Sequence, residues 1–579
     1  MNTYWPEGLP ASLDYPELTV GEMFTAAAGL YGDRTAIVDG AEQLTFAQLR
    51  EHVVTFANAV RDSGVRNGDV VLLHMPNNMW FLVGYYGALL AGATVSLANP
   101  LQPAPALHTQ LLDTGAVLAV SHPAHVPTLL EASAESPLRT IVLVPLSACA
   151  PSAADEPSRA GDAAVVDLAD FVAGRSAAVP QITVTADDVA HIAYTGGTTG
   201  VSKGVRVLHR NMVANVIQMT AWRAAHLVTT TKDSGLRLSP IPGLDDAGVR
   251  PGSAVTVMVS PLFHAHALIH VNFLLLCGAT IVLSGRFSPD RLLEEIEHHR
   301  ATYVTGSPTM WHALLDSPGR NGRDLSSVEV ISSGAAPIDP ATLQALGTAF
   351  PNAVISEGYG LTEATCLVTA APLLRSARRK AGSVGLPIFD TSVQVRPVNG
   401  GAAALGPNET GELWVRGPQV TAGYLNQPDA TAEQFAGGWL RTGDIGRIDE
   451  EGFVFIADRA KDMLIYKGYN VYPRELEDVL HSHPQVATAA VVARSVPRVG
   501  QEPVAFVVPR PGADVDPGEI MAFVAERVLP YKKIRAVQVV DALPTSPAGK
   551  ILKTELRAIA QDGPQPANDP VTTNDSVTL

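Results

Sequence analysis

The sequence predicts an α/β protein with a large N-terminal domain of mixed β-sheets and packed helices, followed by a small α+β domain. Its 579 residues exceed what one hydrophobic core usually supports, so two or more domains are expected. Helical-period and strand-like segments alternate from about Glu17 to Val507, as they do in α/β units. After Asp458 the pattern changes. We therefore predict domains at 1–457 and 458–562, with a disordered tail at 563–579.

The N-terminal half shows this alternation most clearly. Leu44 to Gly64 has the apolar spacing of a helix, and Asp69 to His74 is an apolar run typical of a buried strand. Trp80 to Leu90 is expected to form a further helix. Later strands run into Gly-rich or polar loops, which is where open α/β sheets bind their ligands. These strands are His191–Tyr194, Val328–Ser332 and Ala353–Ser356.

Two segments without a clear period are predicted to be surface excursions. Ala148–Pro180 is rich in Ala, Ser and Pro, and Thr229–Gly252 is rich in Thr, Gly and Pro. The second segment is either a lid or a simple insertion.

The C-terminal region carries its own helix and strand signals. Pro473 is suited to the first turn of a helix, and Asp516 followed by Pro517 is a typical start for another. Val486–Val492 and Val504–Val508 have the composition of strands. A compact α+β domain of about a hundred residues follows from this order.

Composition narrows the class of function. The chain has 41 Lys plus Arg against 57 Asp plus Glu, a net charge of -16, which argues against nucleic-acid binding. Cys149, Cys277 and Cys366 show no metal-binding or redox spacing and are expected to pack in the core. The N-terminal residues lack the features of a secretory signal, and no apolar run reaches transmembrane length. We therefore expect a cytoplasmic protein, as a monomer or homodimer.

A glycine- and threonine-rich segment, Tyr194 to Gly204, directly follows an apolar strand. Glycines let backbone N–H groups approach phosphate oxygens, and the Thr hydroxyls and Lys203 add donors and charge. The segment is not a Walker A motif, because Gly204 stands where that motif has Ser or Thr. A flexible turn is the alternative, but the length of the run favours a phosphate-binding loop.

This loop resembles the signature of the acyl-adenylate-forming superfamily, which comprises acyl-CoA synthetases, peptide-synthetase adenylation domains and luciferases. Five further segments match motifs of that superfamily in the same order, so the resemblance covers nearly the whole chain. In character it is closest to acyl-CoA synthetases, including long-chain fatty acid-CoA ligases. The five segments are Glu357–Glu363, Gly411–Gly417, Trp439–Asp444, Asp458–Asp462 and Pro544–Lys550.

The resemblance implies an ATP site with a Mg²⁺ ion. Tyr359 resembles the residue that stacks on adenine, and Asp444 and Arg459 resemble the pair that binds the ribose hydroxyls. Thr362 is similar to the α-phosphate contact, while Glu363 and Thr199 are similar to the metal ligands. The remaining nucleotide contacts implied in this way are Thr195, Gly196, Gly197, Thr198, Lys203, Gly334, Ala335, Ala336, Glu357, Gly358, Gly360, Ile456 and Lys550.

Lys550 is the residue expected to catalyse adenylation. A carboxylate that attacks the α-phosphate brings two anions together, and a like-charge contact at ~4 Å costs ~4 kcal/mol at an effective dielectric of 20. A positioned ammonium group offsets this repulsion and stabilises the transition state. The alternative, an exposed lysine near the chain end, is disfavoured by the preceding Pro-Thr-Ser-Pro-Ala-Gly. The full predicted catalytic set is Lys550, Thr199, Glu363 and His264.

The resemblance also implies that the small domain rotates between adenylation and thiol transfer. Lys461 occupies the hinge position of the family. Lys467, Gly468 and Tyr469 resemble the loop that admits the pantetheine arm of coenzyme A in the second conformation. Some relatives carry a lysine where this chain has Ile465, so a role for that side chain does not transfer.

The acid pocket is predicted from the segment Pro261–Ala267, which resembles the mouth of the acyl channel. His264 is expected near the carboxylate, whereas His266 is expected to be a hydrogen-bonded core residue. Leu262 and Phe263 are apolar where amino-acid-activating relatives begin their motif with an Asp, which predicts an apolar acid without an α-amino group. The predicted pocket residues are His264, Ala265, Leu268, Ser307, Met310, Ser333, Gly334 and Gly360, with Trp311 as a further candidate for the wall.

Three readings of function remain open at this point. The leading one is an acid–thiol ligase that converts an apolar carboxylic acid to its acyl-CoA with ATP, Mg²⁺ and coenzyme A. A second reading ends with transfer to the phosphopantetheine of a separate carrier protein. A third is a non-catalytic nucleotide-binding partner, which the intact motif residues disfavour. A luciferase-like oxygenase is favoured by no residue.

Overall fold

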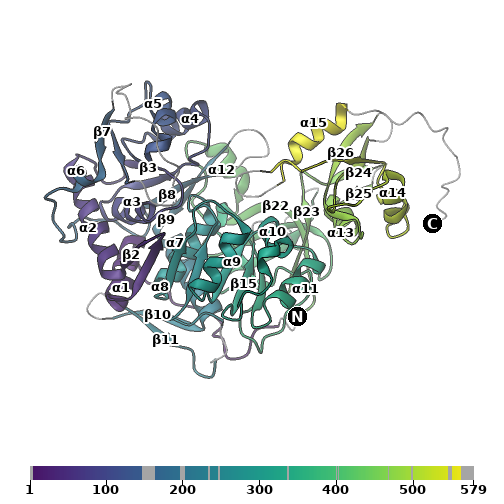
Figure 1. The fold of residues 1–579 in the computed structure, drawn as a ribbon, viewed down its shortest axis with the longest axis horizontal. Coiled ribbons are helices and arrows are strands. Elements are labelled where there is room, and N and C mark those ends of the chain that lie inside the picture. The colour runs from purple at the N-terminus through teal and green to yellow at the C-terminus, as the bar shows by residue number, and fades with distance from the viewer. Residues whose placement is uncertain are drawn as a thin grey trace.

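The computed structural model describes residues 4–145, 163–195, 202–231, 235–244, 248–334, 338–398, 401, 403–466, 469–496, 500–545 and 551–562. The chain forms a large lobe and a small lobe, which lie side by side (Figure 1). The large lobe contains mixed sheets with packed helices, and the small lobe combines a sheet with three helices. The predicted α/β class, with a small C-terminal α+β domain, is therefore confirmed.

The first sheet of the large lobe is built from the apolar runs of the N-terminal third. Its strand order is β7-β6-β5-β3-β4-β8-β9, and all neighbours are parallel except β8 and β9. All five residues of β3 are buried, as expected for a strand covered on both faces. The strands are β3 (Val70–His74), β4 (Thr94–Leu97), β5 (Leu118–Ser121), β6 (Thr140–Leu143), β7 (Ala164–Asp167), β8 (Val189–Tyr194) and β9 (Gly204–Leu208).

A second, nine-stranded sheet carries the candidate site in the described part of the chain. Its order is β18-β17-β16-β15-β14-β12-β13-β1-β2. The strands are β1 (Thr35–Asp39), β2 (Glu42–Thr45), β12 (Val255–Met258), β13 (Thr280–Leu283), β14 (Tyr303–Gly306), β15 (Val330–Ser333), β16 (Val354–Gly360), β17 (Leu367–Ala370) and β18 (Leu386–Pro387).

One element of this sheet differs from the sequence prediction. The strand expected to end at Ser356 continues to Gly360, so part of the predicted ligand loop is itself a strand. The extension has a partner because β17 folds back antiparallel to it, pairing Gly358 with Ala370 and Tyr359 with Thr369. This return of the chain is not a local property of the sequence, so the strand could not be recognised from it.

Helices pack between and around the sheets. α7 and α8 are buried along almost their whole length and contact each other. The predicted helix Leu44–Gly64 is α2, which begins with a capping box between Thr45 and Gln48. The helices of the large lobe are α1 (Val20–Tyr31), α2 (Phe46–Asp62), α3 (Met79–Leu90), α4 (Ala104–Thr114), α5 (Val126–Ala132), α6 (Leu168–Val172), α7 (His209–Ala224), α8 (Ala265–Leu276), α9 (Pro289–His298), α10 (Pro308–Asp316), α11 (Pro340–Ala349) and α12 (Pro428–Gln434).

The two predicted excursions contain more structure than their composition suggested. The first includes α6 and β7, which is an edge strand of the seven-stranded sheet. The second includes an antiparallel hairpin of β10 (His226–Thr230) and β11 (Leu236–Pro240). No helix in the described part of the chain is both long and apolar enough to span a bilayer.

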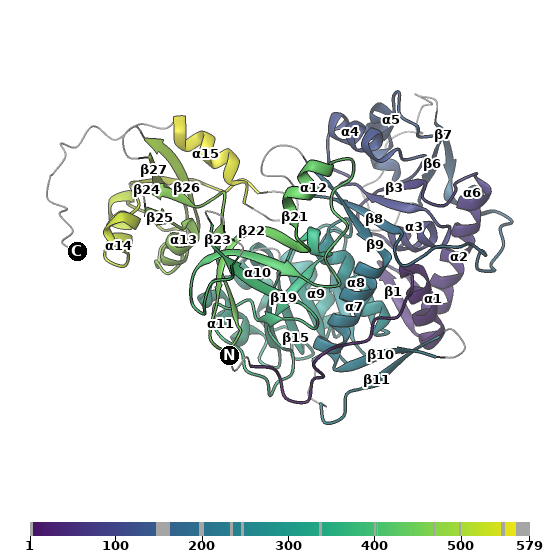
Figure 2. The ribbon, with the colours of Figure 1, turned by 180° about the vertical axis from the view of Figure 1, so that it is seen from behind.

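A third sheet lies on the side of the large lobe nearest the small lobe (Figures 1 and 2). Two of the recognised motifs form its neighbouring strands β20 and β22, and a third motif ends β23. The sheet thus brings together residues that are distant in sequence. Its strands are β19 (Ser392–Arg396), β20 (Gly411–Arg416), β21 (Phe435–Ala436), β22 (Trp439–Ile448) and β23 (Val454–Arg459).

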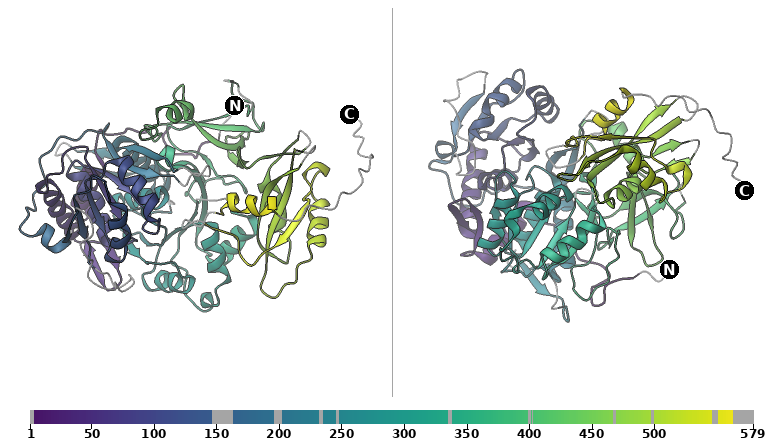
Figure 3. Two further views of the ribbon diagram at one scale, coloured as in Figure 1. Left: turned by 90° about the horizontal axis from the view of Figure 1, so that it is seen from above. Right: turned by 45° about the vertical axis from the view of Figure 1, so that its right-hand side comes forward.

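The small lobe follows the predicted helix and strand order, with longer strands. Asp516 accepts hydrogen bonds from the N–H groups of Gly518 and Glu519, which caps α14. α15 lies on the face of the small lobe that is turned toward the large lobe (Figures 1 and 3). The elements are β24 (Leu464–Tyr466), β25 (Tyr469–Val471), α13 (Pro473–His481), β26 (Val486–Val496), β27 (Gly500–Pro509), α14 (Pro517–Ala525), β28 (Ala536–Val539) and α15 (Lys553–Asp562).

Candidate active site

The predicted ribose pair is formed in the structure. Asp444 and Arg459 face each other on the antiparallel strands β22 and β23, and Nε of Arg459 lies 2.7 Å from Oδ1 of Asp444. The hydroxyl of Tyr359 donates a hydrogen bond to the other carboxylate oxygen of Asp444, at 2.6 Å. Burial and the neighbouring Asp444 raise the pKa of Tyr359, so its phenol remains a donor. Three predicted nucleotide residues therefore meet at one carboxylate.

The backbone beside Tyr359 needs residues without a side chain. A Cβ atom on Gly360 would lie 1.6 Å from the carbonyl oxygen of Cys366, so only glycine fits at that position. Gly358 is similarly close to β17, with a Cβ position 3.3 Å from the carbonyl oxygen of Thr369. Gly334 directly follows β15 and donates its N–H to the carbonyl of Gly306. Ala335 and Ala336 lie outside the described residues.

The predicted phosphate loop is closed at its base. The N–H of Thr195 donates to the carbonyl of Lys203 at 3.0 Å, and the Ser202 hydroxyl donates to the carbonyl of Thr195 at 2.5 Å. These contacts bring the two ends of the loop together. Gly196, Gly197, Thr198 and Thr199 lie outside the described residues.

Tyr424 joins the base of this loop to Glu363. Nζ of Lys203 lies 4.7 Å from the centre of the Tyr424 ring, a cation–π distance. The Tyr424 hydroxyl donates to Oε1 of Glu363 at 2.9 Å. The carbonyl of Glu363 accepts from both the N–H and the hydroxyl of Thr421, which fixes the short 3₁₀ turn that also contains Thr362. The phosphate-loop lysine and the predicted metal carboxylate are thus held at one aromatic side chain.

Glu363 is suited to a magnesium ion. Of the described residues, only Tyr424 donates a hydrogen bond to its carboxylate, and the side chain is half-buried. The remaining oxygen lone pairs fit a hard cation that keeps several waters and binds mainly to phosphate. Thr199, the other predicted ligand, lies outside the described residues.

His264 stands at the N-cap position of α8, directly after a turn that is tied to the other large sheet. The side chain of Asn77, which follows β3, donates to the carbonyl of Ser260 at 2.9 Å and accepts from the N–H of Leu262 at 2.8 Å. The N–H of His264 donates to the carbonyl of Pro261, closing the turn. The position of His264 is therefore fixed by a residue about 180 positions earlier in the chain.

The predicted wall of the acid pocket lies at the ends of β14 and β15. Met310 fills the space beside Gly306, since its Cε lies 1.8 Å from the position of a Cβ atom on that glycine. Nε2 of His266 lies 3.1 Å from the corresponding position on Gly334 and 3.3 Å from the Thr305 hydroxyl, so His266 is hydrogen-bonded, as expected. Ser307 occupies the N-cap position of α10, Leu268 is fully buried in α8, Ala265 begins that helix, and Ser333 ends β15.

The predicted hinge lies in a turn between β23 and β24. The N–H groups of Asp462 and Met463 both donate to the carbonyl of Arg459. Asp462 pairs with Arg557 of α15, which connects the turn to the small lobe. Lys461 itself is exposed. Lys467, Gly468 and Lys550 lie outside the described residues, and Tyr469 begins β25.

Comparison with known proteins agrees with this geometry. Residues 24–425 match the model of the AMP-binding enzyme family, and residues 475–550 match the model of the AMP-binding enzyme C-terminal domain. The chain belongs to the AMP-binding enzyme family.

Similar proteins of this family are CoA ligases. The chain is 34% identical over 583 residues to a long-chain-fatty-acid–CoA ligase of Yersinia pestis, covering 96% of each chain. It is 33% identical over 540 residues to 4-coumarate-CoA ligase 1 of Narcissus pseudonarcissus, covering 91% of each chain. The ATP-bound structure of MatB from Rhodopseudomonas palustris superposes with a TM-score of 0.80 at 26% identity, over 94% of this chain and 99% of that one. The chain is accordingly an adenylate-forming ligase of the CoA-ligase type.

In this AMP-binding enzyme, the small lobe contacts the end of β23 in the large lobe. The N–H of Arg474, at the start of α13, donates to Oδ2 of Asp458, and its guanidinium donates to the carbonyl of Ile456. Burial raises the pKa of Glu357 to about 7, Arg474 opposes that rise, and Asp478 adds to it. Glu357, which belongs to the nucleotide motif, thus interacts electrostatically with charged groups of α13 in the small lobe.

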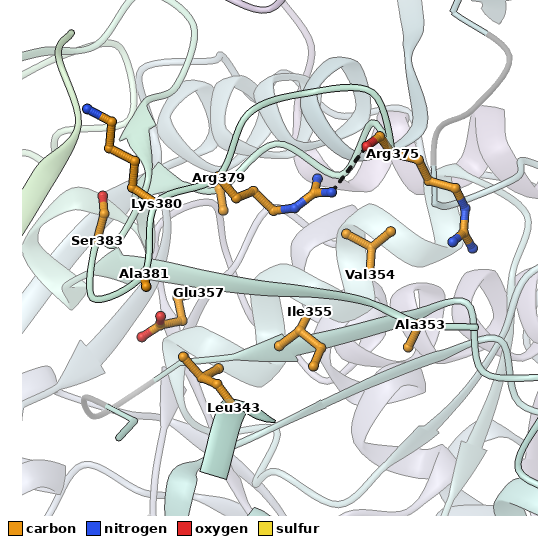
Figure 4. A pocket seen from close by; sticks show the side chains of 11 residues that line it. Leu343, Ala353, Val354, Ile355, Glu357, Arg375, Arg379, Lys380, Ala381 and Ser383 are labelled. Carbon is orange, nitrogen blue, oxygen red and sulfur yellow. Dashed lines mark hydrogen bonds between the residues drawn. The ribbon is translucent and has the colours of Figure 1, made fainter. Parts of the chain in front are cut away.

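A cavity of about 480 Å³ opens beside Glu357, between α11, β16 and the segment that follows β17 (Figure 4). Its three cations already have partners: Arg379 donates to the carbonyls of Pro372 and Leu374, and Lys380 pairs with Asp449. Arg375 donates to the carbonyl of Asn352. This cavity of the AMP-binding enzyme therefore has little left with which to hold a phosphate.

Sequence reasoning missed two positioning residues of this AMP-binding enzyme, Tyr424 and Asn77. Tyr424 directly follows Gly423, shortly after the Gly411–Gly417 motif. An aromatic residue next to a glycine in a loop was the sequence feature that could have indicated a role for Tyr424. Asn77 follows a buried strand in a polar Pro-Asn-Asn turn, the type of position where α/β sheets place functional side chains.

Proposed function

We propose that the protein activates an apolar carboxylic acid with ATP and transfers the acyl group to coenzyme A. The observation that carries the proposal is the meeting of Tyr359, Arg459 and Asp444 at one end of the site, with Lys203 and Glu363 at the other. The names of similar proteins, which include a fatty-acid and a coumarate ligase, support an acid with a largely apolar body.

In the first step a carboxylate oxygen of the acid forms a bond to the α-phosphorus of ATP. The bond between that phosphorus and the bridging oxygen breaks, and pyrophosphate leaves. Lys550 and Lys203 are proposed to offset the repulsion between the two anions. A magnesium ion held by Glu363 and Thr199 would supply further charge neutralisation. The Asp444–Arg459 pair and Tyr359 would orient the nucleoside, so that the acid and the α-phosphorus are aligned.

In the second step the thiol sulfur of coenzyme A bonds to the acyl carbon. The bond between that carbon and the AMP oxygen breaks, AMP leaves, and the thiol proton is released to solvent. We propose that the small lobe first rotates about Lys461, which withdraws Lys550 and brings the Gly468 loop to the site. Gly468 would leave room there for the pantetheine arm.

A separate carrier protein remains the alternative acceptor, because its phosphopantetheine presents the same thiol. A non-catalytic nucleotide-binding partner is the other alternative. The contacts of Glu363, Asp444 and Arg459 support catalysis over that reading, since binding alone does not need a carboxylate placed for a metal.

Product analysis tests the proposal directly. The protein is incubated with Mg²⁺, ATP and a panel of carboxylic acids, with coenzyme A or a holo-carrier protein, and the products are identified by mass. We expect AMP and an acyl-CoA, and pyrophosphate exchange that requires the acid. Exchange without thioester would favour an acyl-AMP ligase, acylated carrier alone would favour the carrier reading, and no exchange with any acid would refute catalysis.

A further inference from the structure

Arg223 is a buried cation at the end of α7 that the nucleotide chemistry does not use. The residue is 1% exposed, and its Nη1 donates to the hydroxyls of Tyr303 at 2.6 Å and Ser332 at 3.0 Å. Its Nε is buried without a hydrogen-bond partner among the described residues. No carboxylate pairs with it in the described part of the chain. Such a charge is costly to bury unless an anion or strong acceptor compensates it.

The groups around Arg223 are polar but neutral. The rings of His266 and His270 lie 4.5 Å apart. Burial lowers the pKa of His266 to about 4, with Arg223 and His264 contributing, and burial, His266 and Arg223 lower that of His270 well below its ordinary value. Nε2 of His270 is also buried without a partner among the described residues. Both imidazoles are therefore neutral at neutral pH, and among the described residues of this cluster only the guanidinium carries a charge.

The cluster touches the predicted wall of the acid pocket through His266, whose Nε2 is 3.1 Å from the position of a Cβ atom on Gly334. Nη2 of Arg223 is 3.7 Å from the corresponding position on Gly358, a predicted nucleotide contact on the neighbouring strand β16. The Thr305 hydroxyl links His266 to the backbone of β15, because it also contacts the carbonyl of Ser332 at 3.2 Å. A short chain of polar groups thus leads from the pocket wall to Arg223.

We propose that Arg223 determines substrate specificity by binding an acceptor oxygen at the far end of the acid. The inference rests on the proposed function and refines it: the acid has an apolar body and carries a hydroxyl, carbonyl or second carboxylate opposite its reacting carboxylate. Among the described residues, Nε has no hydrogen-bond partner and no carboxylate compensates the charge, and these are the two features that this oxygen would satisfy. Arg223 does not touch the reacting atoms and is a specificity residue.

The alternative is a purely structural role, in which Arg223 ties α7 to β14 and β15. Asp245 and Asp246, which lie outside the described residues, precede Val249 closely in sequence, and the N–H of Val249 donates to the carbonyl of Arg223. An internal ion pair with one of these carboxylates would satisfy the guanidinium without a substrate. The two roles predict different responses to the acid.

The test compares acids that differ only at their far end. Pyrophosphate exchange is measured with unbranched alkanoic acids, ω-hydroxy acids and α,ω-dicarboxylic acids of four to twelve carbons. For the wild type we expect kcat/KM at one chain length to be ~10-fold or more higher for an acid with a terminal oxygen, since a buried donor discriminates against an analogue that leaves it unpaired. The hydroxy and dicarboxylic series then distinguish a neutral from an anionic acceptor.

Variants distinguish a role of Arg223 in recognising the acid from a role in stabilising the fold. Arg223→Met should remove most of the preference while lowering kcat/KM for plain alkanoic acids much less. Trp222→Phe is the matched control, because Trp222 is 1% exposed in the same turn and also has an unpartnered ring nitrogen among the described residues. That variant should keep the preference. If Arg223→Met does not fold, Arg223→Lys and Tyr303→Phe decide, and Arg223→Lys should favour the dicarboxylic over the hydroxy acids.

Several results would overturn the inference. A wild type that activates plain acids equally well at every length has no acceptor site. An equal loss for all acids in Arg223→Met, or loss of the preference in Asp245→Asn or Asp246→Asn, would assign a structural role to Arg223. If the wild type activates no acid at all, the proposed function fails first, so the two failures are distinguishable.

Discussion

Oδ1 of Asp444 lies 2.7 Å from Nε of Arg459, and the two residues are directly paired on neighbouring antiparallel strands. The carboxylate side chain is 4% exposed, whereas the guanidinium side chain is 40% exposed. The pair therefore presents an ordered, partly open guanidinium beside Tyr359, whose hydroxyl holds the other oxygen of the same carboxylate. Both carboxylate oxygens of Asp444 are therefore held by neighbouring side chains.

Asp444→Asn should weaken ATP binding more than it weakens the fold. Losing the charge removes one charge-assisted contact to Arg459, so we expect KM for ATP to rise about 10-fold or more. Glu412→Gln is the control, because Glu412 lies in the same sheet but pairs with Arg441 rather than with Arg459. ATP-dependent exchange and thermal unfolding are measured for both. A similar rise in KM in the two variants would contradict a nucleotide role for Asp444.

Lys550→Ala should slow adenylation by roughly 10²-fold or more, the scale observed when one preorganised donor to developing charge is lost. Lys553→Ala is the matched control, since Lys553 pairs with Glu477 at 2.8 Å and is expected to act structurally. Thioester formation from supplied acyl-AMP should change little in Lys550→Ala. An adenylation rate equal to that of the wild type would remove Lys550 from its proposed role.

Lys461→Pro should separate the two half-reactions. Proline fixes φ near -65° and removes the N–H, so the small lobe is expected to be held in one orientation. Acyl-adenylate should then form at close to the normal rate while thioester formation falls by orders of magnitude. Lys461→Ala leaves the backbone free and should affect transfer much less. Equal losses in both half-reactions, or an alanine variant as slow as the proline variant, would argue against rotation at this residue.

His264→Ala should change which acids are accepted more than it changes KM for ATP. Asn77→Ala should shift acid selectivity in the same direction, because Asn77 holds the turn that precedes His264. Steady-state constants for several acids, together with the unfolding temperature, test both variants. A lowered unfolding temperature with unchanged selectivity would make His264 a packing residue.

The contact between the lobes should depend on pH through Glu357. Burial raises its pKa from 4.5 to about 7, so its contribution to stability is fully present below about pH 4.5 and is lost as the pH rises through about 7. Glu357→Gln stays neutral and should not show this loss. Unfolding temperatures of both proteins from pH 5 to pH 8.5 test it, and the variant should gain relative to the wild type as the pH rises. Parallel curves would refute the assignment.

Local signals predicted much of the fold, and long-range contacts account for what was missed. Pro473 and Asp516 mark helix starts through their own backbone chemistry, so α13 and α14 were recognisable. The extension of β16 depends on β17 folding back onto it, which no periodicity encodes.

In the candidate site, too, some residues could be recognised from local sequence and others could not. The nucleotide motifs could be recognised as continuous runs, and Asp444 and Arg459 do meet as predicted. Tyr424 and Arg223 contact partners in distant parts of the chain, so in the sequence one looks like an ordinary aromatic residue and the other like a cation at a helix end. Their importance is visible only where strands from separate parts of the chain converge.

The hydrogen bonds of Asn77 have a mechanical consequence. They connect the loop after β3, in the seven-stranded sheet, to the turn after β12, in the nine-stranded sheet. The two residues that Asn77 contacts lie about 185 positions further along the chain. Because α7 and α8 are also buried and closely packed in the interior, we expect the two sheets to resist sliding past each other. We therefore expect the mouth of the predicted acid pocket to keep its shape if, as proposed, the small lobe moves between the two half-reactions.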